Sequence, residues 1–527
     1  MRTHERRLGW FLALAMAAGA QGCDGCSDEL DEPGTADESG TASGEGSGFA
    51  AFGAPDEPDV AEEPPEPESR RPDIVHDGPP TAADLATTPI EGAWTMWRGA
   101  AHRSGLRDAP AITSPRVIWS ANVGIQGYAN AVLIAEDNTI YASSQGSRHN
   151  QPDEQDGVVA LDPTNGQELW RFTTPSDANG MSMYGDRLYV ATDDGTLFAL
   201  NRTDGTEAWR LDAECGLYQG PIVHDGSIWL VRRDSNIRIN AETGEPESDL
   251  TFCPSGERGS FSVIGDEFVA APNARPLERW VDGNLAWLFE TPSDVSPRFG
   301  SWTPPTLTAS MVVHAHHRWP FGRVGDSPSR RPGALVWWRD NGQQAAAFDV
   351  NDYEEATDTS MRPTPFLRSS PWVFGGHGYW TPVNRPALVK FDLATGEVVA
   401  ERTMPDCRRR QFGSIVGTPS LAYLPRHDGV LYAFSPEDLS VSWTLQLGMH
   451  ALAGTTETHQ PVVDGCSEYP IDGSALFATP SIAADGTLYV GGGDGWIYAI
   501  RDASWGEAPG IAAIEPAEEG SGETNPE

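Results

Sequence analysis

The residues with the clearest capacity for metal chemistry are the histidines of His314-Ala-His316-His317. On an extended strand His314 and His316 point to the same side, so their imidazoles could share one ion if a third ligand were present. His377 stands at a comparable place one repeat later and is the candidate third ligand. Histidines beside a polar channel need no metal, and no Cys-x-x-Cys or His-x-x-x-His pattern lies beside them. We therefore predict no metal site and keep these three residues as weak candidates.

Other catalytic chemistry finds little support in the sequence. No Gly-x-Ser-x-Gly elbow is present to carry a nucleophilic serine, and no two cysteines are adjacent. The 76 Asp and Glu residues could pair for hydrolysis. Sequence alone does not reveal the carboxylate separation of about 5 to 9 Å that such chemistry needs. We predict no catalytic residues and no bound cofactor.

The N-terminus predicts export. Arg2, Arg6 and Arg7 precede an apolar run at residues 8–20, which Cys23 soon follows. As a helix the run would span about 20 Å, less than the ~30 Å hydrocarbon core of a bilayer, so it is typical of a signal peptide. The small residues before Cys23 resemble a bacterial lipobox, and the resemblance implies cleavage before Cys23 and acylation of its thiol. We expect membrane attachment through lipid only.

Composition divides the rest of the chain. Between Asp24 and Asp77 there are 17 acidic residues and two arginines, mixed with Pro, Gly and Ser. Such a segment cannot bury enough apolar surface to offset its ordering entropy, so we expect a disordered, self-repelling tether. The net charge of −40 also excludes nucleic acid as a partner. The predicted segments are a signal peptide at 1–22, a tether at 23–90, a folded body at 91–505 and a disordered acidic tail at 506–527.

A repeat of about 40 residues indicates the fold class. The segment from Asp156 to Trp170 recurs from Asp194 to Trp209. Each unit contains short alternating strands separated by Asp-Gly or Asn-Gly turns, which is typical of antiparallel hairpins. Four strands in this length match one blade of a β-propeller. The turn glycines of successive units are Gly166, Gly205, Gly244 and Gly283, 39 residues apart, with weaker copies at Gly342 and Gly396.

A tryptophan four residues after the glycine is expected to wedge each blade against the next. The final unit, which reaches Ile500, lacks its last strand, and the strand around Trp119 has the sequence to supply it. We predict an all-β, eight-bladed propeller of four-stranded antiparallel blades closed by the N-terminal strand. Seven blades are the alternative, if a degenerate central unit is not a blade. The wedge positions read Trp170, Trp209, Ser248, Trp287, Ala346 and Ala400, with Trp443 at the matching place.

The repeat resembles that of PQQ-like (pyrroloquinoline-quinone-type) propellers, Asp-Gly-x-Leu-Tyr-Ala-Leu-Asp-x-x-Thr-Gly-x-x-x-Trp. The segment from Trp94 to Gly105, with Trp97, Arg98 and Arg103, resembles the lead-in of exported members. The resemblance extends over about residues 94 to 502. It implies either a quinone-dependent dehydrogenase, which would carry an adjacent cysteine pair, or a lipid-anchored scaffold such as the barrel-assembly lipoproteins. Because that cysteine pair is absent, the similarity favours the non-enzymatic branch.

The remaining cysteines suit an oxidising compartment. Cys215 and Cys253 are 38 residues apart, nearly one blade period, and follow their strands at comparable offsets. Cys407 and Cys466 lie in corresponding connections of later blades. We predict the two disulfides Cys215–Cys253 and Cys407–Cys466, which leaves Cys26 in the tether unpaired.

Long insertions predict a recognition face. In a four-stranded meander the second-to-third-strand loops and the blade-to-blade loops share one rim, and every long insert falls in one of them. Loops on a rigid scaffold commonly carry recognition. The inserts are at 145–155, 318–333, 351–363, 378–386 and 448–478. The exposed aromatic residues expected to make contacts are Trp319, Phe321, Tyr379, Trp380 and Tyr469.

These features predict a non-catalytic binding or assembly scaffold that uses its long-loop rim. The expected partner is an envelope protein or peptide, and the protein is expected to be a monomer. Its expected location is the bacterial cell envelope, lipid-anchored at the outer membrane on the periplasmic side or the cell surface. The alternative is an enzyme, either a quinone-dependent oxidoreductase or a hydrolase acting at the same rim.

Overall fold

The computed structural model describes most of the chain between residues 71 and 506. These described residues form 31 β-strands and one 3-10 helix, η1 (Ala503–Trp505). No helix among them is long and apolar enough to span a bilayer. The described ranges are 71–127, 130–213, 217, 220–231, 236–247, 260–271, 276–281, 284–290, 304–318, 331–349, 369–382, 386–405, 413–448 and 475–506.

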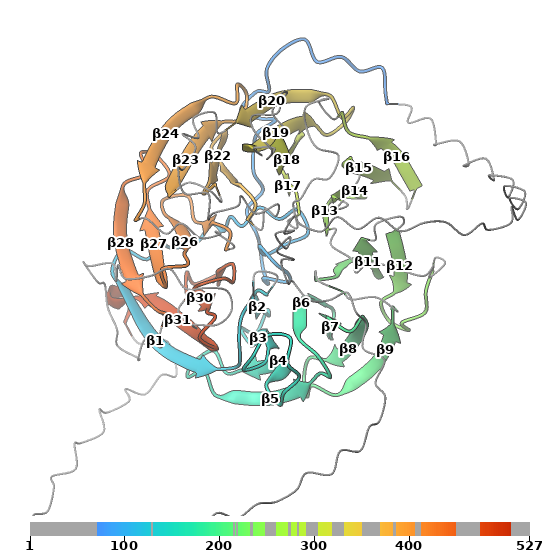
Figure 1. Cartoon of the computed structure of the whole chain (residues 1–527), viewed down its shortest axis with the longest axis vertical. Coiled ribbons are helices and arrows are strands. Elements are labelled where there is room, and N and C mark those ends of the chain that lie inside the picture. Colours follow the sequence, from blue (N-terminus) through green and yellow to red (C-terminus); the bar gives the residue numbers. More distant parts are fainter. Residues whose placement is uncertain are drawn as a thin grey trace, which may run out of the picture. The chain divides into compact units, whose positions relative to one another are not determined.

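The strands form eight antiparallel sheets arranged as the blades of a ring, which confirms the eight-bladed propeller (Figure 1). Blades 1 to 3 contain β2 (Leu133–Ile134), β3 (Ile140–Gln145), β4 (Asp156–Leu161) and β5 (Glu168–Thr173); β6 (Ala178–Tyr184), β7 (Arg187–Thr192), β8 (Thr196–Asn201) and β9 (Glu207–Asp212); and β10 (Ile222–His224), β11 (Ser227–Val231) and β12 (Asn236–Asn240). Blades 4 and 5 contain β13 (Ser260–Ile264), β14 (Glu267–Ala271), β15 (Glu278–Val281) and β16 (Asn284–Leu288); and β17 (Thr306–Leu307), β18 (Met311–Arg318), β19 (Arg331–Trp338) and β20 (Gln344–Asp349).

The remaining blades complete the ring. Blades 6 and 7 contain β21 (Trp372–Phe374), β22 (His377–Trp380), β23 (Ala387–Asp392) and β24 (Val398–Thr403); and β25 (Val416–Gly417), β26 (Ala422–Pro425), β27 (Val430–Phe434) and β28 (Val441–Gln446). Blade 8 contains β29 (Ser481–Ile482), β30 (Leu488–Gly491), β31 (Trp496–Asp502) and β1 (Pro115–Asn122). Burial follows position in the blade: β4 is buried throughout, whereas the outer strand β5 is exposed or half-buried along its length.

The N-terminal strand closes the ring, as predicted. β1 pairs with β31 from Pro115 opposite Asp502 to Asn122 opposite Trp496. The Asp502 carboxylate accepts hydrogen bonds from the backbone N–H of Thr113 at 2.6 Å and of Ser114 at 2.9 Å. Burial opposes ionisation of Asp502, but these bonds and those from Ser504 hold its pKa well below the usual value. The two ends of the propeller are therefore joined by a strand ladder and a charged clamp.

Tryptophan and glycine meet at the joints between blades, as the repeat predicts. A Cβ added at Gly205 would lie 2.4 Å from the Trp170 ring of the preceding blade, so only glycine allows this contact. The indole N–H of Trp170 donates to the carbonyl of Arg202 in the same turn. Equivalent pairs are Trp119 with Gly166 and Pro163 O, Trp209 with Gly244 and Ala241 O, and Trp443 with Ile112 O.

The joint between blades 6 and 7 uses a different side chain. Ala400 occupies the tryptophan position and lies opposite Lys390, whereas the standard blades place alanine opposite tryptophan. The buried Lys390 ammonium donates to Pro436 O at 3.0 Å and Glu437 O at 2.9 Å, in the turn that an indole would otherwise reach. The single lysine of the chain thus replaces a missing tryptophan as the hydrogen-bond donor of its joint.

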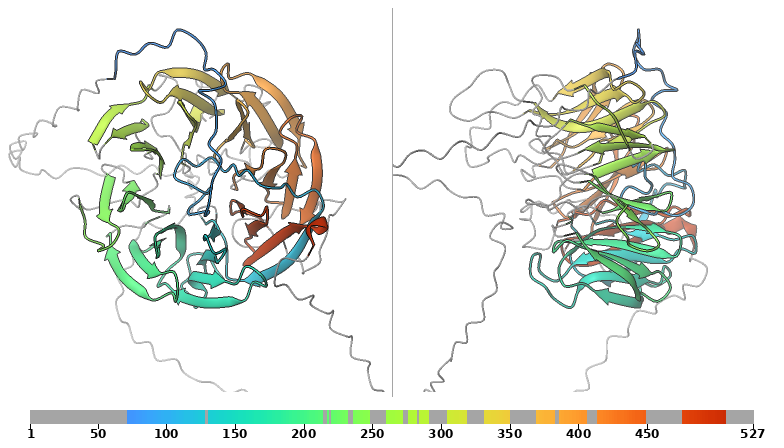
Figure 2. Two further views of the ribbon diagram at one scale, coloured as in Figure 1. Left: turned by 180° about the vertical axis from the view of Figure 1, so that it is seen from behind. Right: turned by 90° about the vertical axis from the view of Figure 1, so that its right-hand side faces the viewer.

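The lead-in segment crosses the axis of the ring. Figure 1 shows this blue segment over the centre of the disc, and the edge-on view shows it along one face (right-hand panel of Figure 2). Its backbone bonds the innermost strands of five blades, each near the end that enters the first short turn. The residue pairs are Trp94 with Ile134, Thr95 with Met183, Ala101 with Val263, His102 with Leu307, and Gly105 with Gly417. We call the edge that carries the short turns, between the first and second and between the third and fourth strands of each blade, the short-turn rim. The lead-in therefore covers the short-turn rim of the propeller.

Arg98 anchors this segment. Its guanidinium is fully buried and donates to Thr306 Oγ1 at 2.8 Å, Pro371 O at 3.1 Å and Ser104 O at 3.2 Å. Burial lowers the pKa of Arg98 to about 9, so the side chain stays charged at neutral pH. One side chain thus connects the lead-in to blades 5 and 6.

The folded body starts earlier than predicted. Residues 71–90, expected in the tether, pack on the short-turn rim of blades 5 and 6 (Figure 2). His76 stacks on Trp338 at 3.7 Å, and its Nε2 lies 2.9 Å from Asp340. Leu85 is buried in the same core as blades 5 and 6. The acidic composition concealed these few anchoring residues. The other predicted tether residues, 23–70, lie outside the described residues.

Replacement of Lys390 should weaken the joint between blades 6 and 7. Lys390→Ala leaves the buried Pro436 carbonyl and the part-buried Glu437 carbonyl with fewer donors, so we expect a loss of about 1–3 kcal/mol in the free energy of unfolding. The double variant Lys390→Ala/Ala400→Trp restores the standard pair and should recover part of that loss. Urea denaturation measures both, with the exposed Thr403→Ala as control. Equal stability of Lys390→Ala and the wild type would contradict this role.

Replacement of Arg98 should release the lead-in. Arg98→Met removes three buried hydrogen bonds and should lower the free energy of unfolding by about 2–4 kcal/mol. Arg98→Lys should rescue little, because one ammonium cannot reproduce the planar fork of donors. Thermal denaturation is the measurement, and Arg116→Met on the exposed face of β1 is the matched control. If Arg98→Met and Arg116→Met have the same melting temperature, Arg98 does not anchor the lead-in.

Candidate functional site

The topology places the predicted inserts on one rim. Each insert joins the second to the third strand of a blade or joins two blades, and in an antiparallel meander those connections leave from the same edge. We call this edge the insert rim. Several boundaries differ from the prediction: residues 331–333 belong to β19, residues 378–380 belong to β22, and residues 475–478 are buried in the core. The lead-in covers the opposite rim, so the lead-in and the long connections lie on opposite faces of the propeller.

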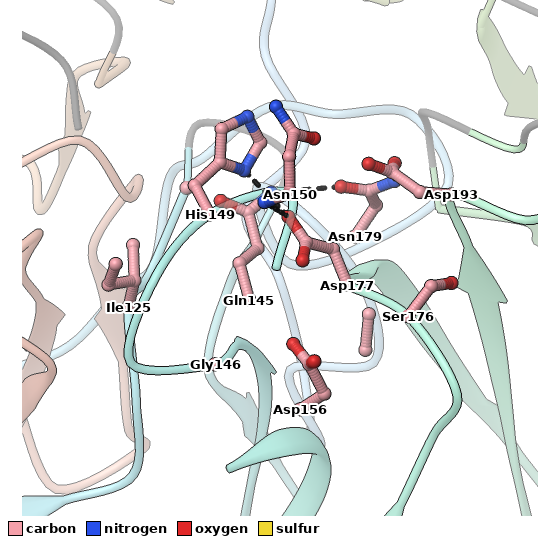
Figure 3. Close-up of polar contacts among 12 residues, drawn as sticks. Ile125, Gln145, Gly146, His149, Asn150, Asp156, Ser176, Asp177, Asn179 and Asp193 are labelled. Atoms are coloured by element: carbon pink, nitrogen blue, oxygen red, sulfur yellow. Dashed lines mark hydrogen bonds and ion pairs between the residues drawn. The ribbon is translucent and has the colours of Figure 1, made fainter. Parts of the chain in front are cut away.

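Three connections of blades 1 and 2 bring a group of polar side chains together at the insert rim (Figure 3). They are residues 146–155 between β3 and β4, residues 174–177 between β5 and β6, and residues 193–195 between β7 and β8. We call the group formed by Asp153, Asp156, Asp177, Asp193 and His149 the acid cluster. Its members come from sequence positions up to 44 residues apart, which the stacking of blades brings together.

Asp177 is the central acceptor of the acid cluster. Its carboxylate is buried and lies 2.6 Å from Nδ1 of His149. The same oxygen accepts the backbone N–H of Asn150 at 3.1 Å. The Asn179 amide connects the next turn by donating to Asp193, and its carbonyl accepts from Gln145 at 2.9 Å. The first connection is thereby tied to the second blade.

Burial and mutual repulsion disturb the titration of two carboxyl groups in the acid cluster. Burial, together with the charges of Asp177, Asp153 and Asp193, raises the pKa of Asp156 to about 7, against a hydrogen bond from the Asp153 backbone. Burial also raises the pKa of Asp193 to about 6, although the Asn179 hydrogen bond opposes the shift. Such shifts are frequent at functional sites, so the acid cluster is the candidate site of the described residues.

The predicted metal candidates do not assemble. His314 and His316 are buried in the middle of β18, as their shared side of one strand suggests. His377 begins β22 beside a short turn, where its Nδ1 contacts Gly375 O at 2.8 Å, and therefore lies toward the other rim. Within the described ranges no three His, Cys, Asp or Glu side chains have the geometry to hold a metal ion.

The expected exposure of two rim aromatics is wrong. Tyr379 and Trp380 lie in β22 and are 2% and 1% exposed. The Tyr379 hydroxyl donates to Pro436 O, and the Trp380 indole donates to Ser369. The repeat is weak at this blade, so the sequence pattern predicts a loop where the chain forms β22. The other predicted rim and cysteine residues lie outside the described residues: Trp319, Phe321, Tyr469, Cys23, Cys26, Cys215, Cys253, Cys407 and Cys466.

A quinone with its calcium ion does not fit the described residues. The resemblance to quinone-dependent dehydrogenases implies an adjacent cysteine pair, which this chain lacks, and a calcium site that contains a carboxylate. The acid cluster is rich in carboxylates, but its described side chains do not converge on a position for a cation. Asp177 is engaged by His149 and Asn150, and Asp193 by Asn179.

Comparisons with known proteins agree with the repeat. Residues 154–247 match a family model described as outer membrane protein assembly factor BamB. BamB of Salmonella typhimurium is 28% identical over 128 residues, covering 21% of this chain and 30% of that protein. Quinohemoprotein alcohol dehydrogenase ADH IIB of Pseudomonas putida is 31% identical over 232 residues, covering 41% of this chain and 28% of that enzyme. These matches span less than a third of either relative's length.

A solved structure supports the fold. The quinohemoprotein alcohol dehydrogenase of Comamonas testosteroni superposes with a TM-score of 0.52 at 14% sequence identity, covering 79% of this chain and 81% of that one. At this identity the likeness concerns the fold alone. Together with the blade joints, these findings show an eight-bladed β-propeller in which residues 154–247 match the repeat of outer membrane protein assembly factor BamB.

Proposed function

We propose that this chain is an exported, lipid-anchored scaffold that binds an envelope protein or peptide through its insert rim without catalysis. The observation that supports it most is the asymmetry of the disc. The lead-in and residues 71–90 cover the short-turn rim, whereas the long connections all leave from the other rim. A rigid ring with long loops on one face is suited to recognition.

The family model supports the assembly role, and the absence of an adjacent cysteine pair weighs against the redox role. The family match to an outer membrane assembly factor covers parts of blades 1 to 3, including most of the acid cluster. Partner identity and the lipid on Cys23 are parts of this proposal. A fold alone does not define an activity, so the argument depends on the rim and its loops.

The alternative enzyme has one specific observation in its favour. Asp156 and Asp193, with pKa values raised to about 7 and about 6, have values suited to general acid catalysis. The Asp156 side chain is fully buried, however, and could not touch a substrate without movement of residues 146–155. The scaffold therefore explains more of the structure than a hydrolase does.

Removal of the longest insert should abolish partner capture. Residues 450–474 can be replaced by a short Gly-Ser linker, which leaves the buried segment from Ala475 intact. We expect at least a tenfold loss of partner captured from envelope extract, identified by mass spectrometry with the wild type as bait. The control is Tyr184→Ala, an exposed aromatic at the β6–β7 turn on the short-turn rim. Equal capture by the insert variant and the wild type would refute recognition by this rim.

A second measurement separates the two classes of function. Purified protein is incubated with pyrroloquinoline quinone and calcium, then dialysed and examined by absorbance. We expect no retained quinone and no alcohol oxidation. Stoichiometric retention with dye-linked turnover would replace the scaffold by the dehydrogenase alternative.

A further inference from the structure

The connection at residues 146–155, which we call the rim loop, is fixed to the propeller by carboxylates. Asp177 accepts the Asn150 backbone N–H, and its carboxylate lies 2.6 Å from Nδ1 of His149 (Figure 3). Asp153 accepts the backbone N–H of Ser147 at 2.7 Å and that of Gln155 at 2.7 Å. Asp156 Oδ2 accepts the backbone N–H of Asp153 at 2.8 Å. Ionisable groups therefore supply most of the contacts that shape this loop.

Charge at the base of the rim loop is not balanced. No arginine or lysine of the described residues forms an ion pair with Asp156, Asp177 or Asp193, and His149 supplies the single cation-forming contact. A Cβ added at Gly146 would lie 2.8 Å from Asp156 Oδ1 and 2.9 Å from Asp153 Oδ1, so these two oxygens are no more than about 6 Å apart. Like charges within about 6 Å of each other disfavour simultaneous ionisation.

The surroundings of Asp156 oppose its ionisation. Its side chain is fully buried, and Oδ1 has no hydrogen-bond partner. A buried ionised oxygen without a donor is far more costly than a neutral carboxyl group in the same place. The closed rim loop therefore favours the neutral form of Asp156, whereas an open loop would expose the group to water.

We propose that the rim loop is an acid-responsive element of the insert rim, closed when Asp156 is neutral and loosened when Asp156 ionises beside Asp153, Asp177 and Asp193. The proposal depends on the geometry of this loop and not on the identity of a partner. If the insert rim recognises an envelope partner as proposed above, the loop makes one part of that face sensitive to the external pH.

The direction of the effect follows from the raised pKa of Asp156. The closed loop holds this proton with a pKa of about 7, whereas an exposed aspartate titrates near 3.9. The closed state binds more protons between these values, so closure is favoured as pH falls and is lost as pH rises through about 7.

Hydrogen exchange of the rim loop tests the proposal. Amide exchange of residues 146–155 in the full chain is measured from pH 6 to pH 8 and divided by the intrinsic rate at each pH. We expect the opening equilibrium to increase about tenfold over this range, as one group with a pKa near 7 requires. Asp156→Asn imitates the neutral form, so its loop should stay protected and independent of pH. The control Asp186→Asn, 84% exposed at a turn on the short-turn rim, should follow the wild type.

A second variant keeps the test decisive if Asp156→Asn does not fold. Asp193→Asn removes one repelling charge, so the midpoint of the opening transition should move to lower pH. Flat exchange in the wild type, or an unchanged midpoint in Asp193→Asn, would overturn the proposal. Because the measurement needs no partner, its failure would leave the insert-rim scaffold untouched, and failed partner capture would leave this loop untouched.

Discussion

The contact between a tryptophan and a turn glycine of the next blade is the interaction on which the propeller depends. A single blade has two apolar faces and cannot bury both, so each must stack on its neighbours. The indole fills the space left by a missing Cβ, and its N–H reaches the carbonyl three residues before that glycine. This pairs apolar burial with a hydrogen bond that buried polar groups require. The hydrogen bond of the joint is also present where the two ends of the propeller meet, because the Trp443 indole donates to Ile112 O beside the closing strand.

Much of the fold could be predicted because these joints leave a regular trace in the sequence. The 39-residue spacing of Gly166, Gly205 and Gly244 indicated the blades, and the strand around Trp119 indicated the closure. The trace fades where other chemistry makes the joint. Lys390 opposite Ala400 serves the same carbonyl with a different side chain on a different strand, and no spacing rule would reveal the exchange.

The candidate site was predictable only as a location. The insert at residues 145–155 indicated a loop on the rim, but the acid cluster needs side chains from three connections that only blade stacking brings together. Burial, rather than residue type, distinguishes Asp156 from the many other aspartates of this acidic chain. Tyr379 and Trp380 show the converse error, since aromatic residues near a weak repeat were assigned to a loop and pack in a strand.

The two rims of the propeller carry different kinds of contact. The tryptophan joints use turns between third and fourth strands, and those turns lie on the rim that the lead-in and Arg98 also hold. Contacts that stabilise the ring are therefore concentrated on one side of the disc. The insert rim carries fewer of these contacts, so it can accept long insertions and even a buried carboxylate oxygen, Asp156 Oδ1, that has no hydrogen-bond donor.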